Sequence, residues 1–341
     1  MGSLRRPCGP VSARRCFRAG RLAAVVLLAV LLVGCPASGP PDPPSPKGDA
    51  RPRPYAVDSP WNQPIPPGAP IHPLTEALVA QIGPKLFSDP TQYTVPVYEA
   101  SDSTAEKDVV VEGLLTEVVD GGRGVVRHKA KTVRIPVPES ASGAPGTDGH
   151  LVVVHPATGR EWGLWRARWT GGGWRATNAY TYDTTWDAAP PRGFGSRGAG
   201  LPYLAGLVRR YEVDSGRIRH AVAFGFPRPS CAATAPASKS DGPGHPDTDL
   251  PEGARLQLDP ALDDEDFAAW GLNDSARVVA RALQEYGMVV VDVSGRPKVY
   301  LEAEQTARWG NALHATSLAG VPMQAFRVLD YRGELDVSSC D

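Results

Sequence analysis

The sequence lacks the short motifs that mark several large enzyme classes. It contains no G-x-S-x-G nucleophile elbow, no P-loop and no C-x-x-C pair. These motifs are the usual signatures of serine esterases, phosphotransferases and thioredoxin-like redox proteins, so their absence disfavours all three classes. The EF-hand and H-E-x-x-H patterns are missing as well, and no internal repeat is visible. We therefore expect neither a bound metal nor an organic cofactor.

The sequence also has almost no net charge: 36 basic residues stand against 37 acidic ones, which gives a net charge of −1. The balance is uneven along the chain: residues 1–34 hold six arginines and no acidic residue, so the remainder is acidic. An acidic body is atypical of nucleic-acid binders, and we expect no nucleic-acid partner. The 36 glycines and 35 prolines disfavour a helical bundle and favour short strands joined by turns.

The apolar run at residues 22–33 is too short for a membrane span. Its twelve residues reach roughly 18 Å as a helix, against about 30 Å for a bilayer core. After a basic segment, such a run indicates a signal peptide. The following Leu32-Val33-Gly34-Cys35 resembles a bacterial lipobox, which implies cleavage before Cys35 and acylation of that cysteine. Ala13-Arg14-Arg15-Cys16-Phe17-Arg18 only partly resembles a twin-arginine motif, so the export route stays open.

These features divide the chain into three parts. We predict a lipoprotein signal peptide at 1–34, a Pro-rich membrane tether at 35–54 and a single β-rich domain at 55–341. The protein is then extracytoplasmic and lipid-anchored to a bacterial membrane. Of the five cysteines only Cys231 and Cys340 remain available, and an exported setting allows them to form a disulfide if they approach each other.

The folded part is dominated by strand patterns. Residues 160–170 and 174–183 predict an aromatic hairpin joined by three glycines, and 207–213 pairs with 218–226 across a D-S-G turn. The clearest helix spans 275–286, and 288–293 follows it as a buried strand. We expect a mainly β fold, a jelly-roll-like β-sandwich with one or two embedded helices, with a barrel or an α+β fold as alternatives.

Residues 193–198 match G-x-G-x-x-G, but no strand precedes them and no helix follows. A dinucleotide fingerprint needs both, so we expect no nucleotide. A flexible surface loop explains the glycines simply. In a substrate-facing loop, Arg197 would hold an anionic group.

Five of the eight tryptophans lie within 161–186. Trp165, Trp169 and Tyr180 are the candidates for a platform that stacks on sugar rings, and the alternative is that these aromatics are core. For acid–base chemistry the sequence offers Glu161 on the aromatic strand, His220 and Asp241 as catalytic candidates. An enzyme with these groups would be a glycoside hydrolase or a polysaccharide lyase.

From about Ser59 onward the chain resembles an uncharacterised family of exported proteins from GC-rich bacteria, a resemblance that implies no activity. The matching stretches are 59–66, 199–208 with 216–222, 239–242, 250–259 and 280–292. The chain departs from the family at 234–237, where a tryptophan is expected.

The leading hypothesis is a membrane-anchored extracytoplasmic lipoprotein that binds or cleaves extracellular polysaccharide through the aromatic hairpin. The alternative is a non-catalytic structural or protein-binding lipoprotein of the cell envelope.

Overall fold

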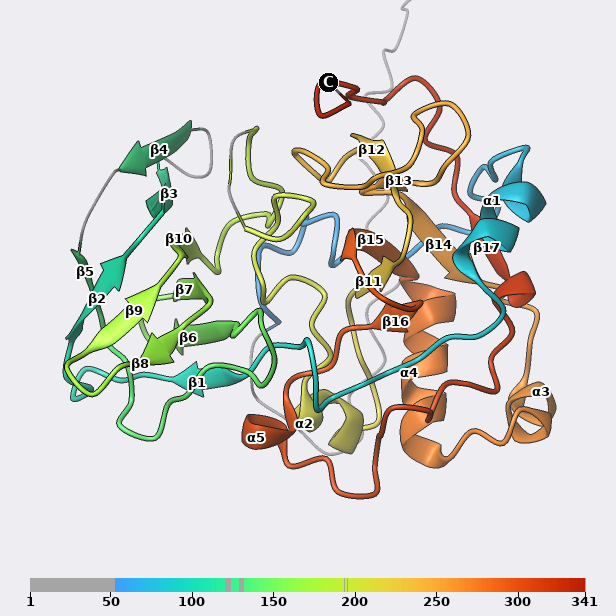
Figure 1. Cartoon of the computed structure of the whole chain (residues 1–341). Coiled ribbons are helices and arrows are strands. Elements are labelled where there is room, and N and C mark those ends of the chain that lie inside the picture. Colours follow the sequence, from blue (N-terminus) through green and yellow to red (C-terminus); the bar gives the residue numbers. More distant parts are fainter. Residues whose placement is uncertain are drawn as a thin grey trace, which may run out of the picture. The chain divides into compact units, whose positions relative to one another are not determined.

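Strands make up most of the regular structure of the protein (Figure 1). The computed structural model describes residues 53–113, 115–119, 124–128, 132–192, 194 and 196–340. These residues belong to one compact unit, Ser45–Asp341. Four sheets and a few helices fill them, which confirms a mainly β fold with embedded helices. The predicted signal peptide, Cys35 and the tether up to residue 52 lie outside the described residues.

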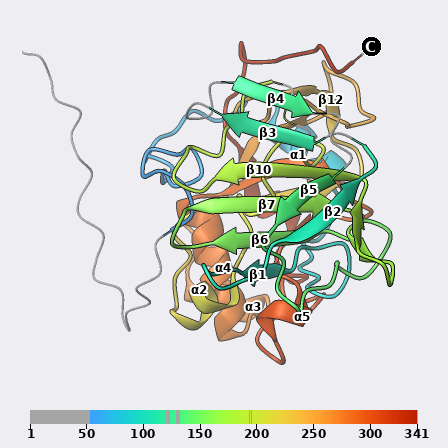
Figure 2. The same ribbon diagram turned by 90° about the vertical axis from the view of Figure 1, so that its left-hand side faces the viewer.

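A six-stranded mixed sheet forms the left side of Figure 1 and faces the viewer in Figure 2. Its strands run in the order β1 (Val97–Glu99), β6 (Leu151–His155), β7 (Arg160–Trp165), β10 (Asn178–Asp183), β3 (Leu115–Val119) and β4 (Gly124–His128). The pairs β6–β7 and β7–β10 are antiparallel, whereas β1–β6 and β10–β3 are parallel.

A four-stranded sheet crosses in front of the six-stranded one in Figure 2. Its order is β5 (Thr132–Ile135), β2 (Lys107–Val111), β9 (Trp174–Ala176) and β8 (Arg168–Trp169). The two sheets share a hydrophobic core in which Val109 and Trp174 of one pack with Val153 and Leu164 of the other. They form a face-to-face pair, as the alternation of apolar side chains along each strand requires.

The predicted aromatic hairpin is present but divided between these two sheets. Its base is the β7–β10 pair and its tip is the β8–β9 pair. The division falls where Arg166 takes a positive φ of 54°, which interrupts the extended strand. Period-two alternation therefore does not continue from Trp165 to Trp169, although the sequence predicts both in one sugar-binding platform.

A five-stranded mixed sheet forms the other side of the unit. Its order is β16 (Lys298–Val299), β11 (Val222–Phe226), β15 (Met288–Val293), β14 (Arg255–Leu258) and β17 (Phe326–Val328). Helices α4 (Asp274–Glu285) and α1 (Thr75–Ile82) pack on it in a shared core. Asn273 caps α4 by accepting a bond from the Ala276 N–H, and Gly287 follows with φ 73°, so this helix has the signals expected from the sequence.

The segment 194–208 joins the two sides through a second core. Phe194, Leu201 and Leu204 pack between Tyr182 of the six-stranded sheet and Val291 of the five-stranded one. The segment has little regular structure, yet its apolar side chains are fully buried. It therefore holds neighbouring residues of both sheets in fixed positions.

The predicted strand at 207–213 is wrong, because most of it forms helix α2 (Arg210–Asp214). The Glu212 carboxylate accepts the Arg209 backbone N–H at 2.9 Å, an N-terminal capping contact that favours a helical turn. The remaining elements are α3 (Asp264–Ala269), α5 (Glu304–Ala307), η1 (Met323–Ala325), and the pair β12 (Ser230–Ala233) and β13 (Pro251–Glu252).

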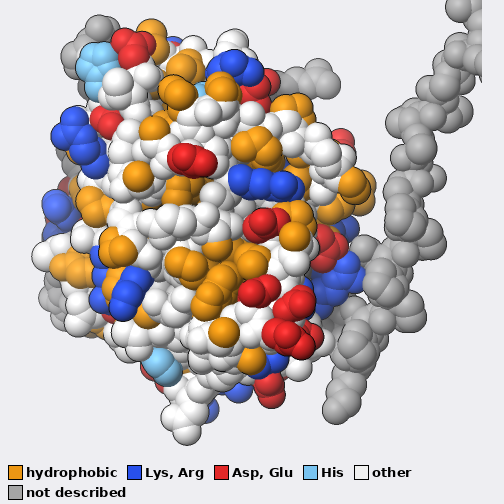
Figure 3. Space-filling view, turned by 90° about the vertical axis from the view of Figure 1, so that its right-hand side faces the viewer, with side chains coloured by type: hydrophobic (Ala, Val, Ile, Leu, Met, Phe, Trp, Pro, Cys, Tyr) orange, Lys and Arg blue, Asp and Glu red, His pale blue; other side chains and the backbone are white. Residues whose placement is uncertain are grey.

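A disulfide joins Cys231 in β12 to Cys340. It ties the C-terminal segment to the strand that leads into the loop carrying Asp241. On the face with α1 and α3, acidic, basic and hydrophobic side chains are interspersed (Figure 3). Among the described helices, none has the length and apolar character needed to cross a bilayer.

Candidate functional site

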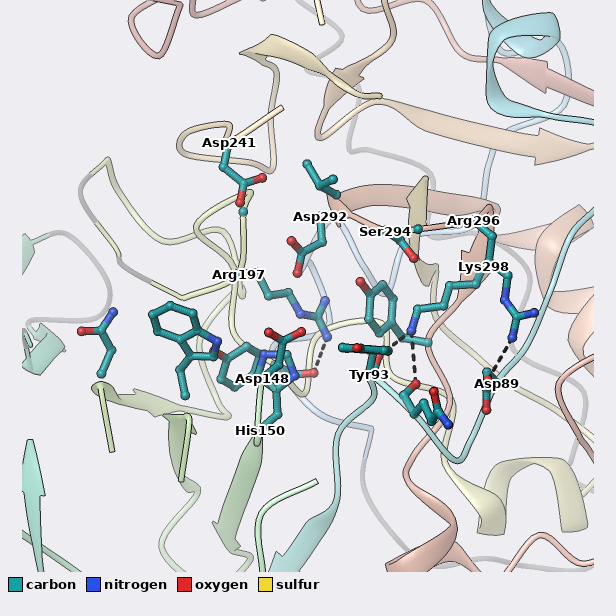
Figure 4. Close-up of a pocket in the computed structure, with 18 of the residues that line it drawn as sticks. Asp89, Tyr93, Asp148, His150, Arg197, Asp241, Asp292, Ser294, Arg296 and Lys298 are labelled. Atoms are coloured by element: carbon teal, nitrogen blue, oxygen red, sulfur yellow. Dashed lines mark hydrogen bonds and ion pairs between the residues drawn. The ribbon is translucent and has the colours of Figure 1, made fainter. Parts of the chain in front are cut away.

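A cavity of about 920 Å³ opens between the six-stranded and five-stranded sheets (Figure 4). Trp165 and Asn178 line it from the six-stranded sheet, and Asp292 and Lys298 line it from the five-stranded sheet. Val293 at the end of β15 lines it as well. Loops and the segment 194–208 supply the remaining lining residues: Asp89, Gln92, Tyr93, Asp148, His150, Arg197, Gly198, Tyr203, Lys239, Asp241, Ser294, Gly295, Arg296 and Tyr300. Acidic, basic and aromatic side chains thus converge on one space.

Asp292 is positioned by an irregularity in the sheet. The pairing of β11 with β15 shifts between Phe224 and Gly225, so Asp292 comes to lie opposite Gly225. The Gly198 backbone N–H donates a hydrogen bond to its carboxylate. Burial, reinforced by the charge of Asp241, nevertheless raises the pKa of Asp292 to about 7. Below that pH the side chain is a neutral acid that faces the cavity.

The carboxyl groups of Asp241 and Glu252 both lie next to Gly198. Glu252 is fully buried, and burial together with the charge of Asp241 raises the pKa of Glu252 well above its usual range. Neither oxygen of the Glu252 carboxyl accepts a hydrogen bond from a donor in the described part of the chain. A protonated Glu252 can therefore donate its own proton to the neighbouring Asp241 carboxylate. A Cβ at position 198 would overlap Asp241 and lie only 2.8 Å from Glu252 Oε1. Glycine at 198 therefore leaves the space that the pair occupies.

Two buried cations flank the ring of Tyr300 on the cavity wall. The Arg197 guanidinium carbon lies 5.3 Å from the ring centroid, and Lys298 Nζ lies 4.9 Å from it. Arg197 donates to the backbone carbonyls of Tyr203 and Ala205, and Lys298 donates to the carbonyl of Tyr93. Burial lowers the pKa of Lys298 to about 8 despite nearby carboxylates, of which Asp89 acts most strongly.

His150 presents an unpartnered nitrogen in the cavity lining. It is 8% exposed, its Nδ1 has no hydrogen-bond partner among the described residues, and the imidazole bonds the backbone of Thr94. Burial lowers the pKa of His150 to about 4, and the cations Arg197 and Lys298 add to the effect. The imidazole is therefore neutral near pH 7, and its free nitrogen can accept a hydrogen bond.

Of the three catalytic residues predicted from the sequence, only Asp241 lines the cavity. Glu161 is fully buried, and its carboxylate accepts bonds from the hydroxyls of Tyr55 and Tyr180 and from the Leu204 N–H at 3.2 Å. Burial raises the pKa of Glu161 in spite of these donors. The carboxyl thus holds the strand β7 to the segment 194–208 and makes no contact with the cavity.

His220 also lies away from the cavity. It is buried, with Nε2 at 3.0 Å from a Glu212 carboxylate oxygen and Nδ1 at 2.9 Å from the Ala221 carbonyl. Burial lowers the pKa of His220, but the charge of Glu212 outweighs it and the net shift is upward. The pair links helix α2 to the strand that follows.

The predicted binding residues fall in three different places. Trp165 is half-buried in the cavity lining and Arg197 lies on its wall. Trp169 is 59% exposed at the hairpin tip, where it makes an edge contact with Trp174, and it does not line the cavity. Tyr180 is buried; its hydroxyl donates to Glu161 and accepts the Tyr203 N–H at 2.7 Å.

Sequence reasoning did not identify Glu252, His150 or Lys298. Asp292 carried the only usable signal, an acidic residue closing a buried strand, and that pattern also suits an ordinary strand end. In the described part of the chain, no group of three or more His, Cys, Asp or Glu side chains is arranged to hold a metal ion. No protein-family model matches this sequence, and no curated protein or solved structure matches it significantly.

Proposed function

We propose that the protein binds a polysaccharide in the cavity and hydrolyses a glycosidic bond there. One observation carries the proposal: a carboxyl that is neutral up to about pH 7, Asp292, shares the cavity with a second carboxyl, Asp241. Glycosidases use such a pair, one carboxyl as acid and the other as base or nucleophile.

The roles follow from the surroundings of each group. Asp292 would give its proton to the glycosidic oxygen as the bond from the anomeric carbon to that oxygen breaks. Water would attack the anomeric carbon, and its proton would pass to the Asp241 carboxylate. Glu252, protonated and able to donate to Asp241, would act as a positioning residue that orients this carboxylate.

The rest of the lining suits a carbohydrate. Trp165 offers an aromatic ring on one wall, and Tyr93 is 45% exposed at the cavity. Aromatic faces stack on the apolar C–H faces of sugar rings. His150 Nδ1 and the amide of Asn178 supply polar atoms that can meet hydroxyl groups.

The site of action in this proposal is the outside of a bacterial membrane. The apolar run and the lipobox-like Leu32-Val33-Gly34-Cys35 support export and acylation at Cys35. The Pro-rich tether then holds the β-rich unit away from the lipid surface, where a wall or capsular polysaccharide would be its substrate.

The proposal is tested by incubating the purified protein with a panel of polysaccharides and measuring both binding and new reducing ends. We expect at least one polymer to be bound and cleaved, and Asp241→Asn to bind it without cleaving it. Binding by wild type without new reducing ends would overturn the catalytic assignment and leave a binding module. No binding by any polymer would overturn the proposal as a whole.

A further inference from the structure

The unusual feature of the cavity is a pair of buried cations that make no direct ion pair with any described residue. Arg197 is 8% exposed and Lys298 is 5% exposed. In the described ranges of the chain neither forms an ion pair; both bond only to backbone carbonyls. Arg296, on the same wall, is different, because Asp89 neutralises it at 2.9 Å. Nearby carboxylates, Asp89 above all, act on Lys298 without pairing with it. A buried charge without a direct partner is costly, so an anionic ligand that pairs with either cation would be stabilised.

Each of the two cations keeps hydrogen-bond donors for a ligand. Both lie beside the Tyr300 ring, Arg197 at 5.3 Å and Lys298 at 4.9 Å from its centroid. Their carbonyl partners fix the two head groups while leaving other N–H donors unused, since a guanidinium carries five and an ammonium three. Figure 4 shows Arg197 and Lys298 on either side of an aromatic ring, with Asp292 above Arg197 in this view.

We infer that the substrate is an anionic polysaccharide, whose uronate carboxylates or sulfate esters bind to Arg197 and Lys298. The inference rests on the proposed function and adds the substrate class to it. The hydroxyl groups of the same sugar would reach His150 Nδ1, the buried acceptor that has no partner in the described structure.

The acidic groups of the lining do not contradict this assignment. Asp89 is already paired with Arg296. Asp292, whose charge acts on both cations, loses that charge below about pH 7, because burial raises its pKa to that value. Asp148 and Asp241 stay on the lining, and Asp241 is the carboxylate that the proposed hydrolysis requires.

The test compares each acidic polymer with its own neutral counterpart, so that the protein is unchanged. Galacturonan, mannuronan and glucuronan are each measured against the carboxyl-reduced form, and a sulfated galactan against its desulfated form, by titration calorimetry at pH 6. We expect at least one acidic polymer to bind at least tenfold more tightly than its neutral form, with the difference shrinking at high salt. A preference for one of the uronic acid polymers identifies the bound group as a carboxylate, and a preference for the sulfated galactan identifies it as a sulfate ester.

Lys298→Met provides the matched protein variant. We expect it to weaken binding of the preferred acidic polymer about tenfold more than it weakens binding of the neutral form. If the variant does not fold, the comparison of the two polymers on wild type still tests the inference. Equal binding and cleavage of acidic and neutral polymers would overturn the inference and leave the proposed function intact. Failure of every polymer to bind would overturn both.

Discussion

The fully buried carboxyl group of Glu252 lies beside the carboxyl group of Asp241 at the cavity wall, and neither Glu252 oxygen accepts a hydrogen bond from a described donor. Two acidic side chains in contact cannot both carry a charge at low cost, so the buried member retains a proton. That proton makes Glu252 a donor and fixes one oxygen of Asp241. The cavity therefore contains one carboxylate that is oriented by a neutral partner and one acid, Asp292, that is protonated up to about pH 7.

Glu252→Gln should preserve activity while Glu252→Ala should not. The amide of glutamine keeps an N–H donor towards Asp241, whereas alanine leaves the Asp241 carboxylate unsupported. We expect kcat to stay within about threefold of wild type for Gln and to fall about tenfold or more for Ala, with KM little changed in both. Equal kcat losses in the two variants would contradict a hydrogen-bonding role.

Gly198→Ala should displace the Asp241 carboxylate, because the added methyl group would overlap it. A shift of about 1 Å in a catalytic group can cost about 100-fold in rate, and we expect a kcat loss of that order. Gly172→Ala is the control, since nothing lies near its Cβ position and its φ is not in the left-handed region. Unchanged kcat in Gly198→Ala, with the protein folded, would contradict the assigned role of Asp241.

Asp292 should make the protein less stable as pH rises. Its folded pKa of about 7 exceeds that of an unfolded aspartate. The protonated Asp292 therefore makes its full contribution to the free energy of unfolding below about pH 4. That contribution, on the order of 2 kcal/mol for a half-buried group, is lost as the pH rises to about 7. Urea unfolding of wild type and Asp292→Asn at intervals from pH 4 to 8 should show this slope in wild type only. The same slope in both proteins would show that another group is responsible.

Trp165 and Trp169 should differ in their effect on ligand binding. Trp165 lines the cavity, whereas Trp169 is 59% exposed outside it. Loss of one stacking contact is expected to weaken binding of the cleaved polymer about 5- to 30-fold in Trp165→Ala. Trp169→Ala should bind as wild type does. A large effect at Trp169 and none at Trp165 would place the ligand on the hairpin tip instead of in the cavity.

Local patterns in the sequence predicted local structure well. The helix over 275–286 and the strand after it could be predicted because Asn273 and Gly287 mark the helix ends and the apolar residues follow regular periods. The hairpin was predicted as continuous, but the positive φ of Arg166 divides it between two sheets. No pattern around that arginine signals the break, so the separation of Trp165 from Trp169 could not be foreseen.

The candidate site was harder to predict because distant segments build it. His150 precedes β6, Arg197 lies in the segment between the sheets, and Lys298 belongs to β16. Only tertiary packing brings them together. Glu161 illustrates the opposite error: a carboxylate among aromatic residues suggested catalysis, but the hydroxyls of Tyr55 and Tyr180 satisfy it within the core.

The central claim is that Asp292 acts as the proton donor for cleavage in the cavity, and the pH dependence of kcat/KM tests it most directly. The measurement follows reducing-end release from the polymer identified by the panel, for wild type and Asp292→Asn between pH 4 and 9. Wild type should lose activity above about pH 7, where Asp292 ionises, and the variant should be about 100- to 10,000-fold slower without that alkaline limb. A variant with wild-type rate, or with the same decline above pH 7, would contradict the claim.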